Sequence, residues 1–262
     1  MSQRFSTISL TGARRIQLLA ALKWGMLVLP PLAAFKLAAF GPQVILMVVI
    51  SILAFGALRA WEASRRRQYI RESRFPPFLV AKLQAKYPQL SAGDADLVLR
   101  GLRQFFVAYL RSERKFVAMP SKVVDFAWHE FILHTRAYAL WCDIAFGKLL
   151  HHTPAEVLGR DPKRNDGLRR TWYWACKEES IDPRQPSRLP LLFALDKKFG
   201  ILGGYAYVPD CRDIDRQSDS GAYCGSEFGD GGGSCGDADG FGGSESSGGD
   251  GGSDGGGCGG GD

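Results

Sequence analysis

The sequence predicts an all-α protein made of an N-terminal transmembrane helical hairpin, a helical domain of four or five helices, and a disordered glycine-rich tail. Three observations support this prediction. Two long apolar stretches lie near the N-terminus, apolar residues in the middle of the chain recur with helical spacing, and 20 of the 32 glycines follow residue 216. Recurrence at three- and four-residue intervals indicates amphipathic helices, because strands would show strict alternation.

The membrane helices are expected within residues 16–62. The stronger of the two apolar stretches covers about 43–61, is uncharged as far as Leu58, and then meets Arg59 and Trp61. This length is close to what a helix needs to cross a bilayer. A tryptophan beside a basic residue is also typical of the boundary between lipid and water.

The weaker apolar stretch covers about 16–35 and contains Lys23 and the pair Pro30-Pro31. A lysine near the end of a span can extend its ammonium group to the headgroups, and membrane helices tolerate proline. The alternative is a signal sequence, but the stretch is long and no small-residue cleavage site precedes the next span. We therefore expect a two-helix hairpin.

Basic segments flank this hairpin on both sides. The first is the N-terminal segment 1–15, with Arg14 and Arg15, and the second is a juxtamembrane linker at 63–74, which includes three consecutive arginines. By the positive-inside rule, both flanks face the cytoplasm. The sequence thus predicts a multi-pass protein of the cell (inner) membrane with its main domain in the cytoplasm. If the first stretch did not span, the three arginines would still keep the domain inside.

The charge of the chain is unevenly distributed. Residues 217–262 carry nine acidic and no basic side chains, so residues 1–216 carry 33 basic and 18 acidic ones, a net charge of +15. A basic body beside a membrane anchor fits an anionic membrane surface. Nucleic acid is not favoured as a partner, because the basic residues are scattered and no recognition motif accompanies them. The six cysteines show no compact disulfide pattern, so we expect thiols in a reducing compartment.

The folded domain is expected at residues 75–216, with an acidic Gly/Ser/Cys-rich tail at 217–262 that buries too little apolar surface to fold. Ser91 and Ser121 are good helix N-caps, and Gly147 is a natural helix end. A short strand is conceivable only near Tyr205. The expected helices cover residues 78–87, 91–111, 121–146, 165–179 and 189–199.

All four histidines lie in one window of 24 residues, from His129 to His152. Asp125 lies one helical turn before His129, so its carboxylate can orient that imidazole. His129 and His134 diverge by about 140° on one helix, so they cannot bind the same ion together. The hypothesis is a metal site in which His129 meets His151 or His152. In an extended dipeptide these two histidines point in opposite directions, so only one of them is expected to bind.

Cys142 and Tyr138 complete the candidate set, Cys142 as a further metal ligand and Tyr138 as a supporting residue beside Asp125. Histidine and cysteine together suit zinc, and a carboxylate also admits iron. The structural alternatives are a simple Asp125–His129 hydrogen bond, Cys142 as a small core residue, and His151-His152 at a helix C-terminus. Nucleophilic catalysis by Cys142 is less favoured, because its place on the apolar stripe argues against exposure.

The same segment resembles the glycine-rich domain-containing protein family. The resemblance rests on Val124-Asp125-x-x-Trp128-His129, on Tyr138-x-x-x-Cys142, on Phe146-Gly147 and on His151-His152-x-Pro154. It covers about 35 residues closely and implies a shared His/Cys segment, with no reaction attached. On these matches Asp125, His129, Tyr138, Cys142, His151 and His152 are carried over as site residues, and His134 is not.

The sequence leaves three functions open. The first is a membrane-anchored cytoplasmic helical module with a His/Cys metal site that serves assembly or sensing, with a possible protein partner. The second is an enzyme that depends on a metal or a histidine, whose reaction the sequence does not name. The third is a purely structural or interaction protein, in which the residues of the His/Cys motif serve only to pack the core.

Overall fold

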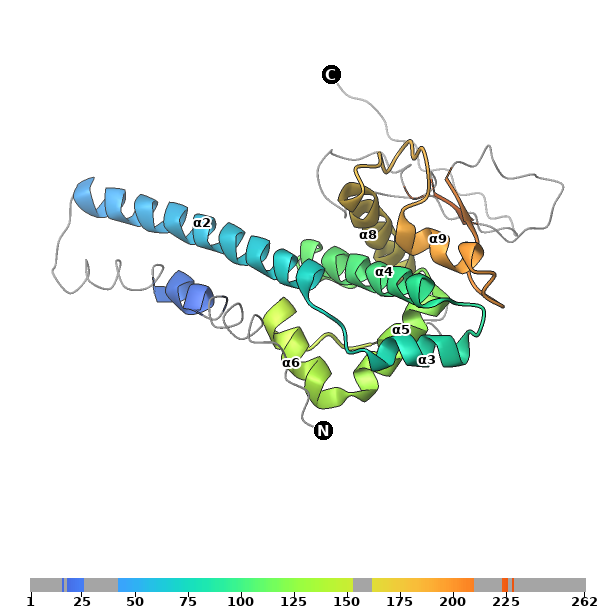
Figure 1. Cartoon of the computed structure of the whole chain (residues 1–262). Helices are drawn as coiled ribbons and strands as arrows, with labels where there is room; N and C mark the ends of the chain where they lie inside the picture. The colour runs from blue at the N-terminus through green and yellow to red at the C-terminus, as the bar shows by residue number, and fades with distance from the viewer. Residues whose placement is uncertain are drawn as a thin grey trace, which may run out of the picture.

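The computed structural model describes residues 16, 18–25, 42–152, 162–209, 223–225 and 228. These residues are mostly helical and include one pair of two-residue strands. The predicted all-α class is therefore confirmed. In Figure 1 one long helix extends away from a body in which shorter helices pack around α4.

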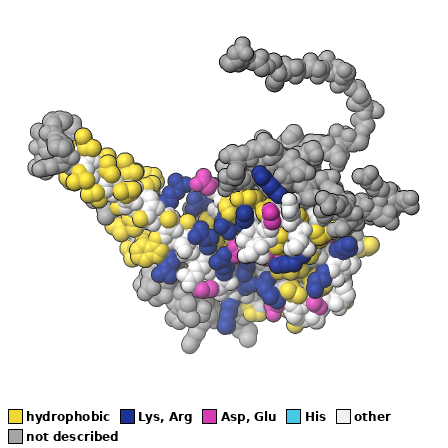
Figure 2. All heavy atoms as spheres, turned by 90° about the horizontal axis from the view of Figure 1, so that it is seen from above, with side chains coloured by type: hydrophobic (Ala, Val, Ile, Leu, Met, Phe, Trp, Pro, Cys, Tyr) yellow, Lys and Arg dark blue, Asp and Glu magenta, His cyan; other side chains and the backbone are white. Residues whose placement is uncertain are grey.

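The extended helix is α2 (Pro42–Glu72), which has 31 residues and a length of roughly 46 Å at the standard rise. Within the described ranges, Val44–Glu72 is the one helix long and apolar enough to cross a membrane by length and composition. Figure 2 shows hydrophobic side chains covering its projecting part, with Lys and Arg gathered over the body. The exposed apolar residues of this part include Ile45, Leu46, Met47, Val49, Ile50, Ile52 and Leu53.

The predicted hairpin is not found, since the described residues contain one membrane-length helix and not two. Residues 18–25 are helical and lie beside α2, where the Trp24 and Phe55 rings are 6.1 Å apart. Lys23 does not extend to the headgroups as expected, because its Nζ lies 2.6 Å from the carboxylate of Glu62. Residues 26–41, which include the end of the first predicted span and the predicted turn, lie outside the described residues.

The segment 63–74, which we expected to be a basic linker, also differs from the prediction. Helix α2 continues through the three arginines as far as Glu72, and Ile70 is fully buried in the core of the domain. Arg66 is buried as well, because its guanidinium forms an ion pair with Glu62 at 2.9 Å. The charged segment is therefore the last part of a helix that enters the domain.

Helix α4 (Ala92–Arg111) lies at the centre of the domain. It packs against α2, α3 (Phe78–Lys86), α5 (Lys122–Leu133), α8 (Pro162–Glu178) and α9 (Leu191–Lys198). The predicted N-cap at Ser91 is confirmed, because Ser91 and Asp94 bond to each other's backbone N–H groups as a capping box. Such a cap satisfies helix donors that would otherwise have no partner.

The core beneath the site is aromatic. The ring of Trp141 lies 4.7 Å from Phe106, 5.6 Å from Phe146 and 5.8 Å from Phe131. Tilted and edge-to-face pairs at such distances add to the free energy gained from burial alone. They fix α6 (Thr135–Phe146) against α4 and α5.

The single helix predicted for 121–146 is divided in two at His134. This residue ends α5 and precedes α6 with a ψ of 58°, which is outside the helical range. Its ring stacks on Phe78 of α3, with 3.8 Å between the ring centroids. Gly147 ends α6 in the left-handed conformation, at a φ of 74°, as its position in the sequence predicts.

The C-terminal part of the domain includes residues that we expected in the disordered tail. Strand β1 (Tyr207–Val208) pairs in parallel with β2 (Tyr223–Cys224), and Phe228 packs against Trp172 at 5.6 Å. Burial of Tyr207 and Cys224, together with the packing of Phe228, explains why this short segment folds in a glycine-rich part of the chain. Gly225 is the remaining described residue of the predicted tail, and the rest of the tail lies outside the described residues.

We expected all six cysteines to be free thiols, and one of them contradicts this expectation. Cys224 is buried and disulfide-bonded, and its partner lies outside the described residues. Cys142 and Cys176 are free and buried. The sequence spacing did not reveal this bond, because disulfide pairing depends on which segments the fold brings together.

Candidate functional site

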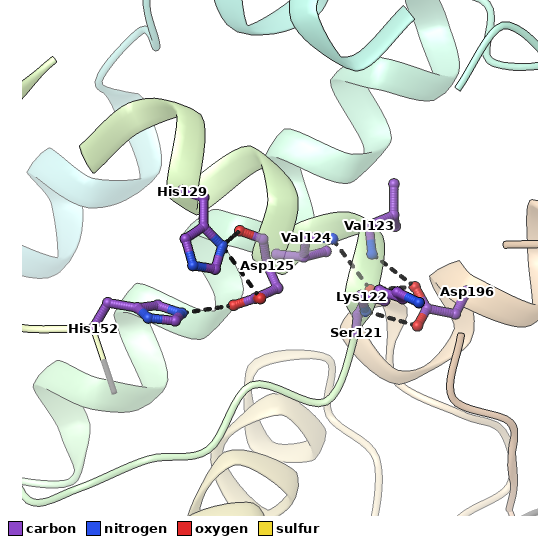
Figure 3. Close-up of polar contacts among 8 residues, drawn as sticks. All are labelled: Ser121, Lys122, Val123, Val124, Asp125, His129, His152 and Asp196. Atoms are coloured by element: carbon purple, nitrogen blue, oxygen red, sulfur yellow. Dashed lines mark hydrogen bonds and ion pairs between the residues drawn. The ribbon is translucent and has the colours of Figure 1, made fainter. Parts of the chain in front are cut away.

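The candidate site begins at the N-terminus of α5, which a buried carboxylate holds in place. Asp196 of α9 is only 2% exposed and accepts hydrogen bonds from the backbone N–H groups of Lys122 at 2.7 Å and Val123 at 3.1 Å. It also accepts from the hydroxyl of Ser121 at 2.8 Å and from the N–H of Tyr205 at 2.9 Å. A carboxylate at a helix N-terminus is favourable for the helix dipole. These contacts fix the direction in which α5 leaves the loop (Figure 3).

One turn further along α5, the Asp125 carboxylate lies between two imidazole rings (Figure 3). Its Oδ1 is 2.9 Å from Nε2 of His152, and its Oδ2 is 3.3 Å from Nδ1 of His129. The same Nδ1 is 3.0 Å from the backbone carbonyl of Asp125, so this carbonyl is its nearer acceptor. The two rings are 4.1 Å apart between centroids.

These three residues offer one ligand atom each, and the three atoms lie within 4.8 Å of one another. Their exposure is graded, with 48% for the His129 side chain, 33% for Asp125 and 11% for His152. The cluster is thus open on the His129 side and closed behind His152. Such an arrangement leaves room for a ligand beside a bound ion.

His152 is held by a chain of hydrogen bonds from the core. The indole N–H of Trp128 donates to the hydroxyl of Tyr138 at 3.1 Å, and this hydroxyl donates to the carbonyl of Leu150 at 2.5 Å. Trp128 also meets the His152 ring edge to face at 4.5 Å. Tyr138 therefore fixes the backbone at Leu150, two residues before His152.

The other candidate residues lie elsewhere. Cys142 is fully buried, burial raises the pKa of its thiol, and it does not belong to the group of ligand atoms found among the described residues. His151 is exposed, and so is His134, which stacks on Phe78. Of the adjacent pair His151-His152, the structure thus brings the second to Asp125.

The cluster lies in the wall of a cavity of about 810 Å³. Aromatic and aliphatic side chains form much of its lining, and three basic residues, Arg114, Lys122 and Lys148, join them. Among the described residues of that lining, Asp125 is the one acidic residue. The Lys, Arg and Asp side chains of the described lining therefore have an excess of positive charge, which favours an anionic ligand.

Sequence reasoning missed Asp196 and the basic lining of the cavity. Asp196 had a local signal, because it is an acidic residue within the apolar run Leu191-Leu192-Phe193-Ala194-Leu195, and a buried carboxylate needs hydrogen-bond partners. The basic residues of the cavity lining had no such signal in the sequence, because 33 Lys and Arg are spread over the chain. Only the fold shows which of them converge.

Fold and site together define a helical domain, attached to one membrane-length helix, in which a carboxylate lies between two imidazoles beside a cavity. The chain belongs to the UCP032817-like family, whose model matches residues 65–228. The match begins within α2, in agreement with the continuation of this helix into the domain. The description of this family names no activity, and the predicted resemblance to glycine-rich domain-containing proteins stays a prediction. No curated protein and no solved structure matches the chain.

Proposed function

We propose that the chain is a membrane-anchored helical module that binds one divalent metal ion through Asp125, His129 and His152. The observation that carries this proposal is the proximity of their three ligand atoms, all within 4.8 Å. Tetrahedral zinc holds nitrogen and oxygen ligands at about 2.0–2.2 Å, which separates the ligand atoms by roughly 3.3 Å. The His129 side chain is 48% exposed, and rotation of its ring would bring a nitrogen closer to the other two ligand atoms.

The donor set is two histidines and one carboxylate. This set is found in zinc sites that keep a fourth position open and in iron(II) sites with open positions. Cys142 is not part of the proposed site, because it lies in the core with its thiol pKa raised. The metal of this proposal is zinc, with iron(II) as the alternative that the same ligands accept.

A bound ion would join α5 to the segment that follows α6, because Asp125 and His129 belong to α5 and His152 to that segment. An ion that links two elements contributes its binding free energy to their packing. This is the physical basis for a role in assembly or sensing. It also predicts that metal removal loosens residues 148–152.

The anchoring of the module is part of the proposal. The apolar part of α2 would enter the bilayer, and the arginines at its domain end would keep the domain on the cytoplasmic side by the positive-inside rule. Arg66 adds little to this effect, because it is buried against Glu62. The basic body would lie against the anionic surface of the membrane.

Elemental analysis of the full chain, purified in maltoside micelles with a tag that lacks histidine, tests the metal site. We expect one zinc or iron per wild-type chain and loss of the metal in Asp125→Asn and His152→Gln. His134→Gln is the matched control, since it removes an exposed histidine outside the cluster and should keep full metal content. Equal metal content in all four proteins would refute the assignment.

A histidine-dependent enzyme without a metal is the second candidate. The contact between the Asp125 carboxylate and Nε2 of His152 at 2.9 Å supports it, because a carboxylate that orients an imidazole is a frequent arrangement for general-base catalysis. The same metal analysis distinguishes the two candidates. A folded wild-type chain that takes up no zinc or iron would favour this second function.

A further inference from the structure

We propose that the cavity beside the metal site binds the phosphate headgroup of an anionic membrane lipid. The inference rests on the proposed metal function, because a bound ion would add positive charge to the cavity. It names a ligand class that the metal site alone does not specify. Three observations support it, namely the apolar lining, the basic residues and an unpaired guanidinium nitrogen, and the proposed membrane anchoring would place the cavity near the bilayer.

The lining combines two kinds of side chain. Phe105, Phe116, Met119 and Leu149 are among its apolar side chains, and they suit a hydrocarbon portion of a ligand. Arg114 and Lys148 lie in the same lining, and the ammonium group of Lys148 is 6.0 Å from the centre of the Tyr109 ring. An amphiphilic anion matches this combination better than a purely polar one.

Arg114 has hydrogen-bonding capacity to spare. Its Nε is buried and has no hydrogen-bond partner among the described residues. A buried donor without a partner costs free energy, so such groups in folded proteins call for an explanation. Its backbone has a φ of 64° next to Glu113 at 53°, an unusual conformation for two consecutive residues with side chains. The Arg114 side chain also lines the cavity, so a small rotation of the guanidinium would bring this nitrogen to a phosphate oxygen bound there.

Contacts with α2 bring this end of the cavity close to the apolar part of the helix that we propose to enter the bilayer. Glu113 forms an ion pair with Arg59 at 2.9 Å, and Arg59 follows directly on the apolar part of α2. On the other side, a Cβ at Gly147 would be 3.1 Å from the guanidinium of Arg66, and Lys148 is the next residue. Arg114 and Lys148 are therefore beside the part of α2 that leaves the membrane.

The charge favours a phosphate over a carboxylate. Arg114, Lys122, Lys148 and a divalent ion supply more positive charge than Asp125 balances. A phosphate monoester carries close to two negative charges at neutral pH and offers three strong acceptor oxygens. The carboxylate of a fatty acid carries one charge and two oxygens. The ligand class is thus a phosphate monoester, and the membrane-facing position selects a lipid over a soluble phosphate.

Calorimetric titration of the zinc-loaded full chain in maltoside micelles tests the proposal with three probes: dihexanoyl phosphatidic acid, inorganic phosphate and decanoate. We expect the phosphatidic acid to bind most tightly. Arg114→Gln and Lys148→Gln should each weaken this binding by about tenfold, as for a lost hydrogen bond between charged groups. Arg65→Gln, which removes an equal charge from α2 outside the cavity lining, should change it by less than about twofold.

Each outcome decides one point. If inorganic phosphate binds as tightly as phosphatidic acid, the ligand need not be a lipid, and this part of the proposal is overturned. If decanoate binds as tightly as phosphatidic acid, the preference for a phosphate group is overturned. A zinc-loaded chain that binds no probe would overturn the ligand assignment while the metal function stands. A chain that takes up no metal but binds phosphatidic acid through Arg114 would overturn the metal function and support the ligand class.

Discussion

Replacing Asp196 by asparagine removes the negative charge that holds the beginning of α5. In the structure Oδ1 accepts from the Ser121 hydroxyl and the Val123 N–H, and Oδ2 accepts from the N–H groups of Lys122 and Tyr205. An asparagine keeps one carbonyl oxygen and places an NH₂ group opposite two donors. Two donors therefore lose their acceptor, either the buried Ser121 hydroxyl and Val123 N–H or the partly buried N–H groups of Lys122 and Tyr205.

The expected loss of stability follows from these contacts. Each buried donor without a partner costs about 1–3 kcal/mol, and loss of the charge at a helix N-terminus costs about 0.3–1 kcal/mol more. The sum is about 4 kcal/mol, a large part of the roughly 5–15 kcal/mol that stabilises a typical domain. For a chain of this size it corresponds to a decrease in Tm of roughly 8–16 °C.

Thermal unfolding of the full chain in maltoside micelles, followed by near-ultraviolet circular dichroism, measures this decrease through the aromatic core. Asp182→Asn is the matched control, because Asp182 is exposed and accepts the N–H of Arg184 at 3.0 Å. Its Tm should change by no more than about 2 °C. An equally small change in Asp196→Asn would refute the idea that this carboxylate fixes α5.

Three further predictions concern the site and its surroundings. Tyr138→Phe removes the hydroxyl that bonds to Leu150, so zinc affinity measured with a competing chelator should fall roughly 10–100-fold; unchanged affinity would argue against a positioning role. Gly225→Ala would place a Cβ 2.4 Å from the Trp172 ring, so the free energy of unfolding should fall by about 1–3 kcal/mol. An unaltered Tm in thermal unfolding would disprove this loss. Burial raises the pKa of the Cys142 thiol, so iodoacetamide at pH 8 should alkylate this thiol far more slowly in the folded chain than in urea. Mass spectrometry measures the rate of alkylation, and equal rates in the two conditions would contradict the burial of the thiol.

Local signals in the sequence were sufficient for most helix boundaries. Ser91 and Ser121 cap the helices that they were predicted to cap, and Gly147 ends α6, because capping depends on a few neighbouring residues. The break at His134 had no such signal, since neither glycine nor proline is present there. It accompanies the stacking of His134 on Phe78 of α3, a contact between segments distant in the sequence.

The membrane region shows the same limit. Three consecutive arginines predict a solvated linker when the sequence is considered alone, because basic side chains seldom enter a core. In the structure Arg66 is buried with partners from two directions, Glu62 in α2 and the carbonyl oxygens at the end of α6. Only the fold brings the carbonyl oxygens of α6 to the Arg66 guanidinium. The same holds for Lys23, whose partner Glu62 is 39 residues away.

For the site, helix geometry predicted part of the arrangement. The four-residue spacing of Asp125 and His129 places the carboxylate beside the imidazole, at 3.3 Å, and the opposite directions of adjacent side chains predicted that only one of His151 and His152 would face it. Which of the two does so depends on the chain from Trp128 through Tyr138 to Leu150. That chain joins α5, α6 and the loop, so it has no signature in a single segment.

The site is assembled from two elements with different attachments. Helix α5, which carries Asp125 and His129, is held by Asp196 of α9. The segment that carries His152 follows the end of α6, where Arg66 of α2 donates to the carbonyl of Ile144 at 2.6 Å. One half of the site is thus fixed by α9. The other half is fixed both to the core, through Tyr138, and to the helix that we propose to cross the membrane, through Arg66. Metal affinity should therefore depend on an intact α2, which is why the measurements proposed above require the full chain.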